Sequence, residues 1–255
     1  MNRLFDPIER ALRATGEALF LLAAAVWECR LAPFHLHKIL AQMAEIGAAT
    51  LPITAMISLF IGGVLSLQTG STLANYGIQG TLGGIVGASM VKELGPVMTA
   101  ILLTGRVGSA MAAEIGAMSV YQEIDALTTM NISPVRFLVM PRLLSTVVVL
   151  PVLVIYSDVI GWVGGGVVAA VNHRINIPFR LFMRNLTETV EFKDVTDGLI
   201  KAMVFGVIIA TTCCYVGLQT AGGPREVGQS VTKAVVFSFI LILIFDYVVT
   251  RMLFL

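Results

Sequence analysis

Lys92 and Glu93 are neighbours in a part of the chain that otherwise carries almost no charge. No charged residue occurs over positions 46–91, and a glycine–proline pair follows at positions 95–96. Consecutive helix residues point about 100° apart, so these two side chains do not neutralise each other. Two interpretations are open. Either Lys92 faces a cavity and attracts an anionic group while Glu93 pairs within the protein, for which Arg106 is one candidate, or both belong to a buried ion network.

Asp158 and Asp246 raise the same question, because each lies inside an apolar stretch. They could carry protons or be fixed partners of cations. The sequence contains no G-x-x-x-x-G-K-[ST] phosphate loop, H-E-x-x-H zinc motif or G-x-S-x-G nucleophile motif. Its three histidines and three cysteines form no recognisable ligand set, and the net charge of +1 indicates no basic face for nucleic acid. We therefore expect no catalytic or metal site, no cofactor and no nucleic-acid partner in this chain.

The composition predicts an all-α integral membrane protein. The chain is 56% hydrophobic and 13% charged, whereas soluble domains carry about 25% charged residues. A spanning helix needs about 20 apolar residues. Five stretches meet or approach this length: 47–67, a stretch that begins near 81 and includes Lys92 and Glu93, 143–171, 202–219 and 234–252. Five spans place the termini on opposite sides, and the distribution of lysine and arginine places the N-terminus inside.

Residues 1–45 are predicted to form an interfacial region, and residues 46–255 the membrane domain. Apolar residues recur at helical spacing in the first region, at Leu4, Ile8, Leu12, Leu19, Ala23 and Val26. The continuous apolar part, 18–27, is too short to span a bilayer. This pattern is typical of an amphipathic helix lying in the membrane interface. A helix packed on a soluble partner is the alternative.

Small residues recur four positions apart in the predicted spans. Examples are Gly80, Gly84 and Ala88, and also Gly161 and Gly165. Such steps let membrane helices approach closely. They predict tight helix packing, within one chain or across a dimer.

A connecting segment between the second and third spans has its own periodicity. Apolar side chains recur every three residues, at Ile115, Met118, Tyr121, Ile124 and Leu127, while Glu123 and Asp125 point elsewhere. Asn131 and Pro134 end the predicted helix, which covers about 118–130. A short amphipathic helix on the cytoplasmic side suits docking into a groove of another subunit. The alternative is a plain interfacial helix.

Long strings of this sequence resemble the MlaE family of ABC transporter permeases. They are "KELGPVMTAILLTGRVGSAMAAEIGAM", the following "QEIDAL" and, near the C-terminus, "DYVVTRMLF". The resemblance runs from about Gly47 to the end of the chain. It implies a multi-pass permease in the bacterial inner membrane that forms a homodimer. Its partners would be a cytoplasmic ATPase, a periplasmic hexamer of MCE-domain proteins and often a STAS-domain subunit. The complex would move phospholipids between the inner and outer membranes.

The same resemblance explains the missing phosphate loop, because ATP and Mg would be bound by the separate ATPase and this chain would not be the enzyme. Asn131 departs from the family pattern, in which glycine is common at this position, but asparagine also tolerates the left-handed conformation.

The resemblance also implies two sites. A lipid cavity would lie between the first spans of two copies, with a phospholipid phosphate near Lys92 and Glu93 at its floor. Leu65, Gln68, Thr72 and Tyr76 share one face if the first span continues as a helix past Gly70. The expected lipid-binding residues are therefore Leu65, Gln68, Thr72, Tyr76, Lys92, Glu93 and Leu94. The expected ATPase-coupling residues are Met118, Tyr121, Glu123, Ile124, Asp125 and Leu127.

Two other functions remain alternatives from the residues alone. One is a proton-coupled secondary transporter that uses Glu93, Asp158 and Asp246. The absence of an obvious inverted repeat weighs against it. The other is a membrane scaffold that anchors partner subunits without a transport path.

Overall fold

The computed structural model describes residues 6–30 and 36–253. Five helical stretches in this part of the chain are long and apolar enough to cross a membrane, which confirms the predicted number of spans. They are Leu36–Asn75, Gln79–Val120, Val135–Val171, Phe192–Leu218 and Pro224–Leu253. No strand occurs over the same residues, so the all-α prediction is confirmed as well.

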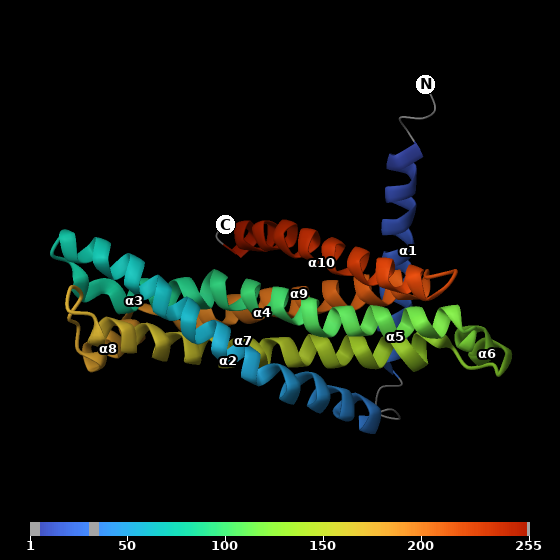
Figure 1. Ribbon diagram of the computed structural model, residues 1–255, viewed down its shortest axis with the longest axis horizontal. Coiled ribbons are helices and arrows are strands. Elements are labelled where there is room, and N and C mark those ends of the chain that lie inside the picture. Colours follow the sequence, from blue (N-terminus) through green and yellow to red (C-terminus); the bar gives the residue numbers. More distant parts are fainter. Residues whose placement is uncertain (1–5, 31–35, 254–255) are drawn as a thin grey trace. The chain divides into compact units, whose positions relative to one another are not determined.

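Ten α-helices follow one another along the described chain (Figure 1). They are α1 (Asp6–Glu28), α2 (Leu36–Asn75), α3 (Leu82–Ser89), α4 (Gly95–Leu103), α5 (Ser109–Val120), α6 (Glu123–Thr129), α7 (Met140–Val171), α8 (Phe179–Thr189), α9 (Phe192–Leu218) and α10 (Pro224–Leu253). A 3₁₀ turn, Gln79–Thr81, precedes α3. Three π-helical turns, Met90–Leu94, Thr104–Gly108 and Val135–Val139, separate other elements.

The spanning helices are longer than the apolar stretches that predicted them. α2 begins at Leu36 and continues to Asn75, beyond both limits of the predicted 47–67. α9 begins at Phe192, ten positions before the predicted start at residue 202. Hydropathy detects only the part of a helix that faces hydrocarbon, whereas polar residues at its ends keep the helical conformation.

The chain divides into two compact units. The first takes its described residues from Met1–Ala44, Thr104–Thr146 and Gly206–Leu241, and the second from Glu45–Leu103, Val147–Phe205 and Ile242–Leu255. Each unit is thus assembled from three separate parts of the sequence. The division of the chain at residue 45 into an interfacial region and a membrane domain stays a prediction.

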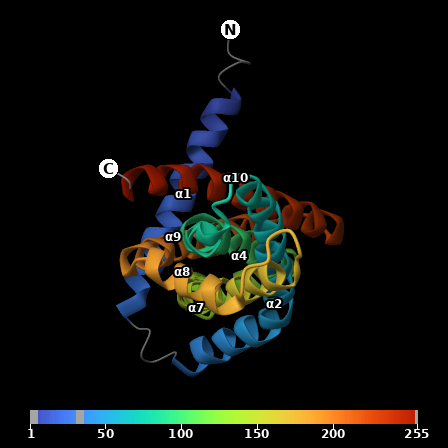
Figure 2. The same cartoon turned by 90° about the vertical axis from the view of Figure 1, so that its left-hand side faces the viewer.

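Apolar packing in the second unit joins the end of α2, the start of the second span, the end of α7 and α8. The buried residues are Leu73, Leu82, Val86, Met90, Ala169, Ile175, Ile177, Phe182 and Leu186. α8 lies against α3 (Figures 1 and 2), where methyl groups at Gly83 or Gly84 would overlap Phe182 and Thr189. The backbone N–H of Gly84 also donates to Oδ1 of Asn185, at 2.6 Å. Glycine in this stretch therefore serves packing within the chain.

A second close approach joins α2 to α7. A methyl group at Gly62 would overlap the carbonyl oxygen of Gly161, and one at Gly164 would overlap the carbonyl oxygen of Leu59. The hydroxyls of Ser58 and Ser157 share a hydrogen bond of 2.7 Å in the same region. The predicted small-residue packing is confirmed for Gly84 and Gly161, but nothing in the described residues lies within 4 Å of a methyl group placed at Gly80.

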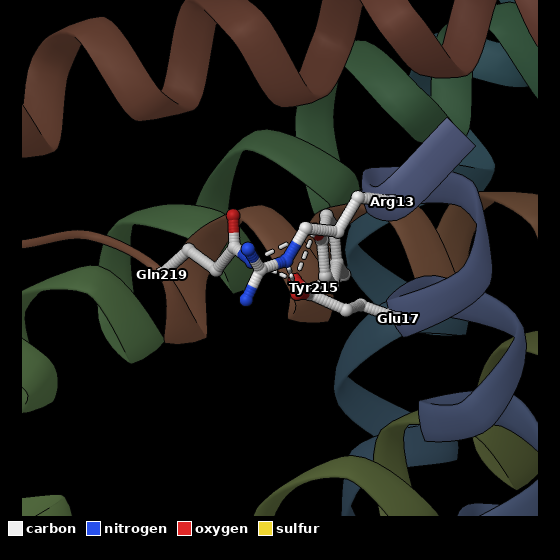
Figure 3. A network of polar contacts seen from close by, with 4 residues as sticks. All are labelled: Arg13, Glu17, Tyr215 and Gln219. Carbon is white, nitrogen blue, oxygen red and sulfur yellow. Dashed lines mark hydrogen bonds and ion pairs between the residues drawn. The ribbon is translucent and has the colours of Figure 1, made fainter. Parts of the chain in front are cut away.

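In the first unit, polar contacts hold α1 against α9 (Figure 3). The hydroxyl of Tyr215 and the side-chain amide of Gln219 donate to Oε2 of Glu17, at 3.0 and 2.7 Å. Arg13 donates to the other carboxylate oxygen at 3.0 Å. These donors, Arg13 first and then Tyr215, hold the pKa of the Glu17 carboxyl below its ordinary value. The stabilisation of the fold by these hydrogen bonds is present at pH values above the ordinary pKa of a glutamate. It is lost as the pH falls through the lowered pKa of Glu17.

The other end of α1 is tied to the segment before α7. Arg136 forms an ion pair with Glu28, with 2.8 Å between Nε and Oε2. Leu19 and Val26 of the predicted apolar stripe are exposed, at 65% and 56%. Leu4 lies outside the described residues, as do the side chains of Ile8 and Leu12. The interfacial location of α1 stays a prediction.

Candidate functional site

Lys92 and Glu93 lie on the π-helical turn Met90–Leu94, which interrupts the second span. The N–H of Gly95 donates to the carbonyl oxygen of Met90, five residues back. Pro96 has no N–H to offer the carbonyl oxygen of Lys92, which lies four residues before it. The ammonium of Lys201 donates to that carbonyl oxygen instead, at 2.8 Å. A side chain of α9 thus completes the backbone bonding that the proline leaves open.

The same lysine is the centre of an ion network. Its Nζ lies 2.8 Å from Oε2 of Glu93 and 3.4 Å from Oδ1 of Asp246. Thr250 donates to the second carboxylate oxygen of Glu93, at 3.2 Å. Lys92 forms a separate ion pair with Asp194, with 3.0 Å between Nζ and Oδ1. Since Lys201 is only 2% exposed, the network is centred on a buried cation.

Of the two interpretations of Lys92 and Glu93, the structure favours the ion network. Glu93 pairs with Lys201, so the suggestion of Arg106 was wrong. Asp246 is the fixed partner of a cation, which was one of its two predicted roles. Lys201 was not among the predicted residues, because the fourth apolar stretch begins at residue 202 and this lysine was expected outside the membrane.

A polar pocket of about 270 Å³ lies beside the network, and Lys92 and Lys201 contribute to its wall. The other lining residues are Thr189, Glu191, Lys193, Asp194, Asp197, Thr250 and Leu253. The pocket and the network together contain three lysines and five carboxylates. The carboxylates are Glu93, Glu191, Asp194, Asp197 and Asp246. Lys92 is therefore not an isolated cation in hydrocarbon, because it has both a carboxylate partner and a polar pocket.

Asp158 is buried in α7, at 6% exposure, and stands apart from these ion pairs. Its Oδ1 has no hydrogen-bond partner among the described residues. That oxygen lies over Gly95, where a methyl group would overlap it. Glycine at position 95 therefore gives this carboxyl room next to the π turn. Both roles predicted for Asp158, carrying a proton and pairing with a cation, stay predictions.

A separate groove brings together three of the expected lipid-binding residues. Leu65, Gln68 and Leu94 line a depression of about 310 Å³, together with Phe60, Ile61 and Val64. This groove and the polar pocket share no lining residue. Leu94 follows Glu93 directly, so the ion network fixes the position of one wall of the groove.

α2 continues as a helix past Gly70, as the predicted common face requires. Thr72 lies farther along it, and Tyr76 lies in the turn directly after its last residue, Asn75; both are exposed, Tyr76 at 76%. The hydroxyl of Thr72 donates to the backbone oxygen of Gln68, at 3.0 Å. The structure therefore joins Leu65 and Gln68 to Leu94, but it does not bring Lys92 into the same groove. A lipid-binding role for any of these residues stays a prediction.

The segment predicted to contact the ATPase is not one helix. α5 ends at Val120, and Gln122 adopts a left-handed conformation with φ of 59° before α6 begins at Glu123. Met118 consequently lies on α5, Tyr121 lies in the turn, and Ile124 and Leu127 lie on α6. The three-residue spacing across this break was wrongly read as one continuous helix. Asn131 has φ of 59°, which confirms that the chain uses the left-handed conformation there.

The exposed side chains of this segment form a mixed polar and apolar surface. Tyr121 is 68% exposed and Met130 is 69% exposed. Glu123 and Asp125 are exposed in the first turn of α6, whereas Ile124 and Leu127 are half-buried. An exposed aromatic side chain beside two carboxylates suits contact with a basic, partly apolar surface.

Comparisons with known proteins agree with this architecture. The family model described as "Permease MlaE" matches residues 39–252. A probable ABC transporter permease protein of Rickettsia typhi is 38% identical over 222 residues, which cover 87% of this chain and 85% of the relative. A probable ABC transporter permease protein of Synechocystis is 38% identical over 215 residues, covering 84% and 81%.

A third relative has a more specific name. The intermembrane phospholipid transport system permease protein MlaE of Haemophilus influenzae is 32% identical over 243 residues, which cover 95% of this chain and 92% of the relative. The family model alone spans most of the chain, including all the ion-network residues. The chain therefore belongs to the MlaE permease family.

Proposed function

We propose that this chain is the membrane-spanning permease subunit of an ATP-driven ABC transporter that moves phospholipids between the inner and outer membranes. The match of the permease model over residues 39–252 carries the proposal, and the name of the Haemophilus relative supplies the substrate class. This chain is a permease and not an enzyme, and we propose that ATP and Mg are bound by a separate ATPase. The family match favours this function over the proton-coupled transporter and the scaffold.

The assembly is part of the same proposal. We expect two copies of the chain in the bacterial inner membrane, a cytoplasmic ATPase, a periplasmic MCE-domain hexamer and, in some complexes, a STAS-domain subunit. The resemblance of the sequence to the family supports each of these partners. Five candidate spans support the multi-pass location.

For the lipid path, we propose the groove of Leu65, Gln68 and Leu94, extended by Thr72 on α2 and by Tyr76 in the turn that follows it. An apolar wall with a few polar groups suits an amphiphile. Because Lys92 and Glu93 are engaged in ion pairs, we assign them a positioning role. They hold the π turn that places Leu94 in the groove.

A photocrosslinking residue in place of Leu65 tests both the function and the path. In the reconstituted complex, it should capture labelled phospholipid to an extent that changes with ATP, because a transport path fills and empties during the ATPase cycle. The same residue in place of Leu243, an exposed position on α10, measures labelling by bulk lipid. Nucleotide-insensitive capture at Leu65, equal to that at Leu243, would reject this groove as the path. Failure of any ATPase to co-purify or to drive lipid movement would reject the function itself.

Reversing the charge of α6 tests the coupling surface. The double change Glu123→Lys and Asp125→Lys should weaken ATPase binding by about tenfold or more, since like charges facing each other cost several kcal/mol. Co-purification and lipid-stimulated ATP hydrolysis measure the effect. Glu188→Lys, an exposed reversal on α8, is the control. A double variant that retains an intact and fully coupled complex would exclude an essential charge role for this pair.

A further inference from the structure

A second groove runs between α2 and α7, on the other side of the ridge formed by Phe60 and Val64. It has a volume of about 290 Å³, and only apolar residues line it. Phe60 and Val64 also line the Leu65 groove, so the two depressions flank the same part of α2. Gly63 and Gly164 are among the lining residues and contribute no side chains to it. This apolar groove, named here the α2/α7 channel, suits a hydrocarbon chain.

A third depression lies beside this channel, at the end of α7. The pocket has a volume of about 580 Å³, and its lining consists of Val167, Val168, Val171, Asn172, His173 and Arg174. Val167 and Val168 line both depressions, so the two lie next to each other on α7. One end of the surface is therefore purely apolar, and the other ends in an amide, an imidazole and a guanidinium. No acidic residue lines either part.

The polar end is held by an ordered turn. Ile175 and Ile177 are anchored in the core, at 1% and 3% exposure. The N–H of Asn176 donates to the backbone oxygen of Asn172, at 2.8 Å, and the N–H of Ile177 donates to that of Ala169, at 3.2 Å. His173 and Arg174, which lie between these anchors, are exposed. The turn thus fixes the backbone from which both polar side chains project.

Arg174 forms no ion pair within 4 Å in the part of the chain that the structure describes. A cation beside the last turn of α7 also interacts favourably with the helix dipole. The helix dipole explains why a cation occurs at this end of α7, but it does not explain the apolar groove beside that cation. An amphiphile with a negative headgroup accounts for both features. Guanidinium binds phosphate through paired hydrogen bonds.

We propose that these two adjoining depressions together bind an anionic glycerophospholipid. One acyl chain lies in the α2/α7 channel, and the phosphate group lies against Arg174 and His173 at the level of the headgroups. We assign the lipid a net negative charge because the lining contains no carboxylate that could pair with the ammonium group of a zwitterionic lipid. The lipid is resident and separate from the cargo that moves along the Leu65 groove.

The test is photocrosslinking from Val167, which lines both parts of the surface, in the full complex reconstituted into phosphatidylcholine vesicles. The vesicles contain a trace of labelled phosphatidylglycerol or, in a parallel sample, labelled phosphatidylcholine. Phosphatidylglycerol should be captured about fivefold more than phosphatidylcholine, the factor expected for one arginine at a membrane surface. Capture should not change with nucleotide. Arg174→Gln should bring the ratio close to one, and Arg180→Gln, an exposed arginine on α8 that does not line the pocket, should leave it unchanged.

Three results would overturn the proposal. One is an equal yield with both lipids at Val167, matching that of a crosslinker at Leu243, which would mean bulk lipid only. Another is crosslinking to a second copy or another subunit, which would make the groove a protein interface. The third is nucleotide-dependent capture, which would assign the groove to the transport path. Melting temperatures of both arginine variants establish that neither result comes from misfolding.

Discussion

Replacing Lys201 with methionine should destabilise the folded protein by about 3 kcal/mol, at the low end of what breaking a buried ion pair costs. The change removes the cation shared by Glu93 and Asp246 and the donor to the carbonyl oxygen of Lys92. Methionine keeps the length of the side chain. The loss of stability therefore comes from two carboxylates left without a cation and from a carbonyl oxygen left without a hydrogen-bond donor. The melting temperature of the purified protein should fall by roughly 5–10 °C.

Two further variants separate this explanation from a general sensitivity of the region. Lys193→Met removes an exposed lysine of the same polar pocket and should have little effect, because the described residues show no ion pair for it. Adding Glu93→Gln and Asp246→Asn to Lys201→Met should restore part of the lost stability, since the uncompensated charges are gone. If Lys201→Met melted like the unmodified protein, the network would not be stabilising.

Adding a single methyl group at Gly62 should have the second largest effect. The new Cβ of Gly62→Ala would overlap the carbonyl oxygen and carbon of Gly161, which are backbone atoms and cannot rotate away. α2 and α7 would have to separate, at a cost of about 1–3 kcal/mol for an overpacked contact. Reduced folded yield and a melting temperature lower by several degrees, roughly 3–10 °C, are the expected readings.

Gly228→Ala is the matched control, because it makes the same chemical change in α10 where nothing in the described residues lies within 4 Å of the new Cβ. Alanine is a better helix former than glycine by about 1 kcal/mol, so this variant should be neutral or slightly more stable. Equal behaviour of the two variants would show that the approach of α2 to α7 is not close in the folded protein.

Much of the fold could be predicted from composition and spacing. Five apolar stretches predicted five spans because a long helix in hydrocarbon has to be apolar. Helix ends could not be placed in this way. Hydropathy assigned Lys201 to a loop, although it lies in the tenth position of α9, where the carboxylates of Glu93 and Asp246 stabilise its charge.

Ion pairs between residues far apart in the sequence could not be predicted from the periodicity of the sequence. Glu93 finds its cation more than 100 residues away on α9, and only the packing of the second span against α9 selects Lys201 over Arg106. The break at Gln122 in the predicted helix could not be foreseen for another reason. A three-residue spacing of apolar side chains continues across it, and a left-handed glutamine has no clear sequence signal.

The π turns of the second span change how its sequence must be projected onto a helix. Each such turn inserts one extra residue, which rotates all later side chains by about 100° relative to an uninterrupted α-helix. The turn at Met90–Leu94 thus rotates the side chains of α4 by about 100° relative to those of α3. A helical wheel drawn across this turn without a break therefore assigns the α4 side chains to the wrong face. Deleting one residue from the turn would shorten the chain by a single position, yet it would turn the side chains of α4 to a different face.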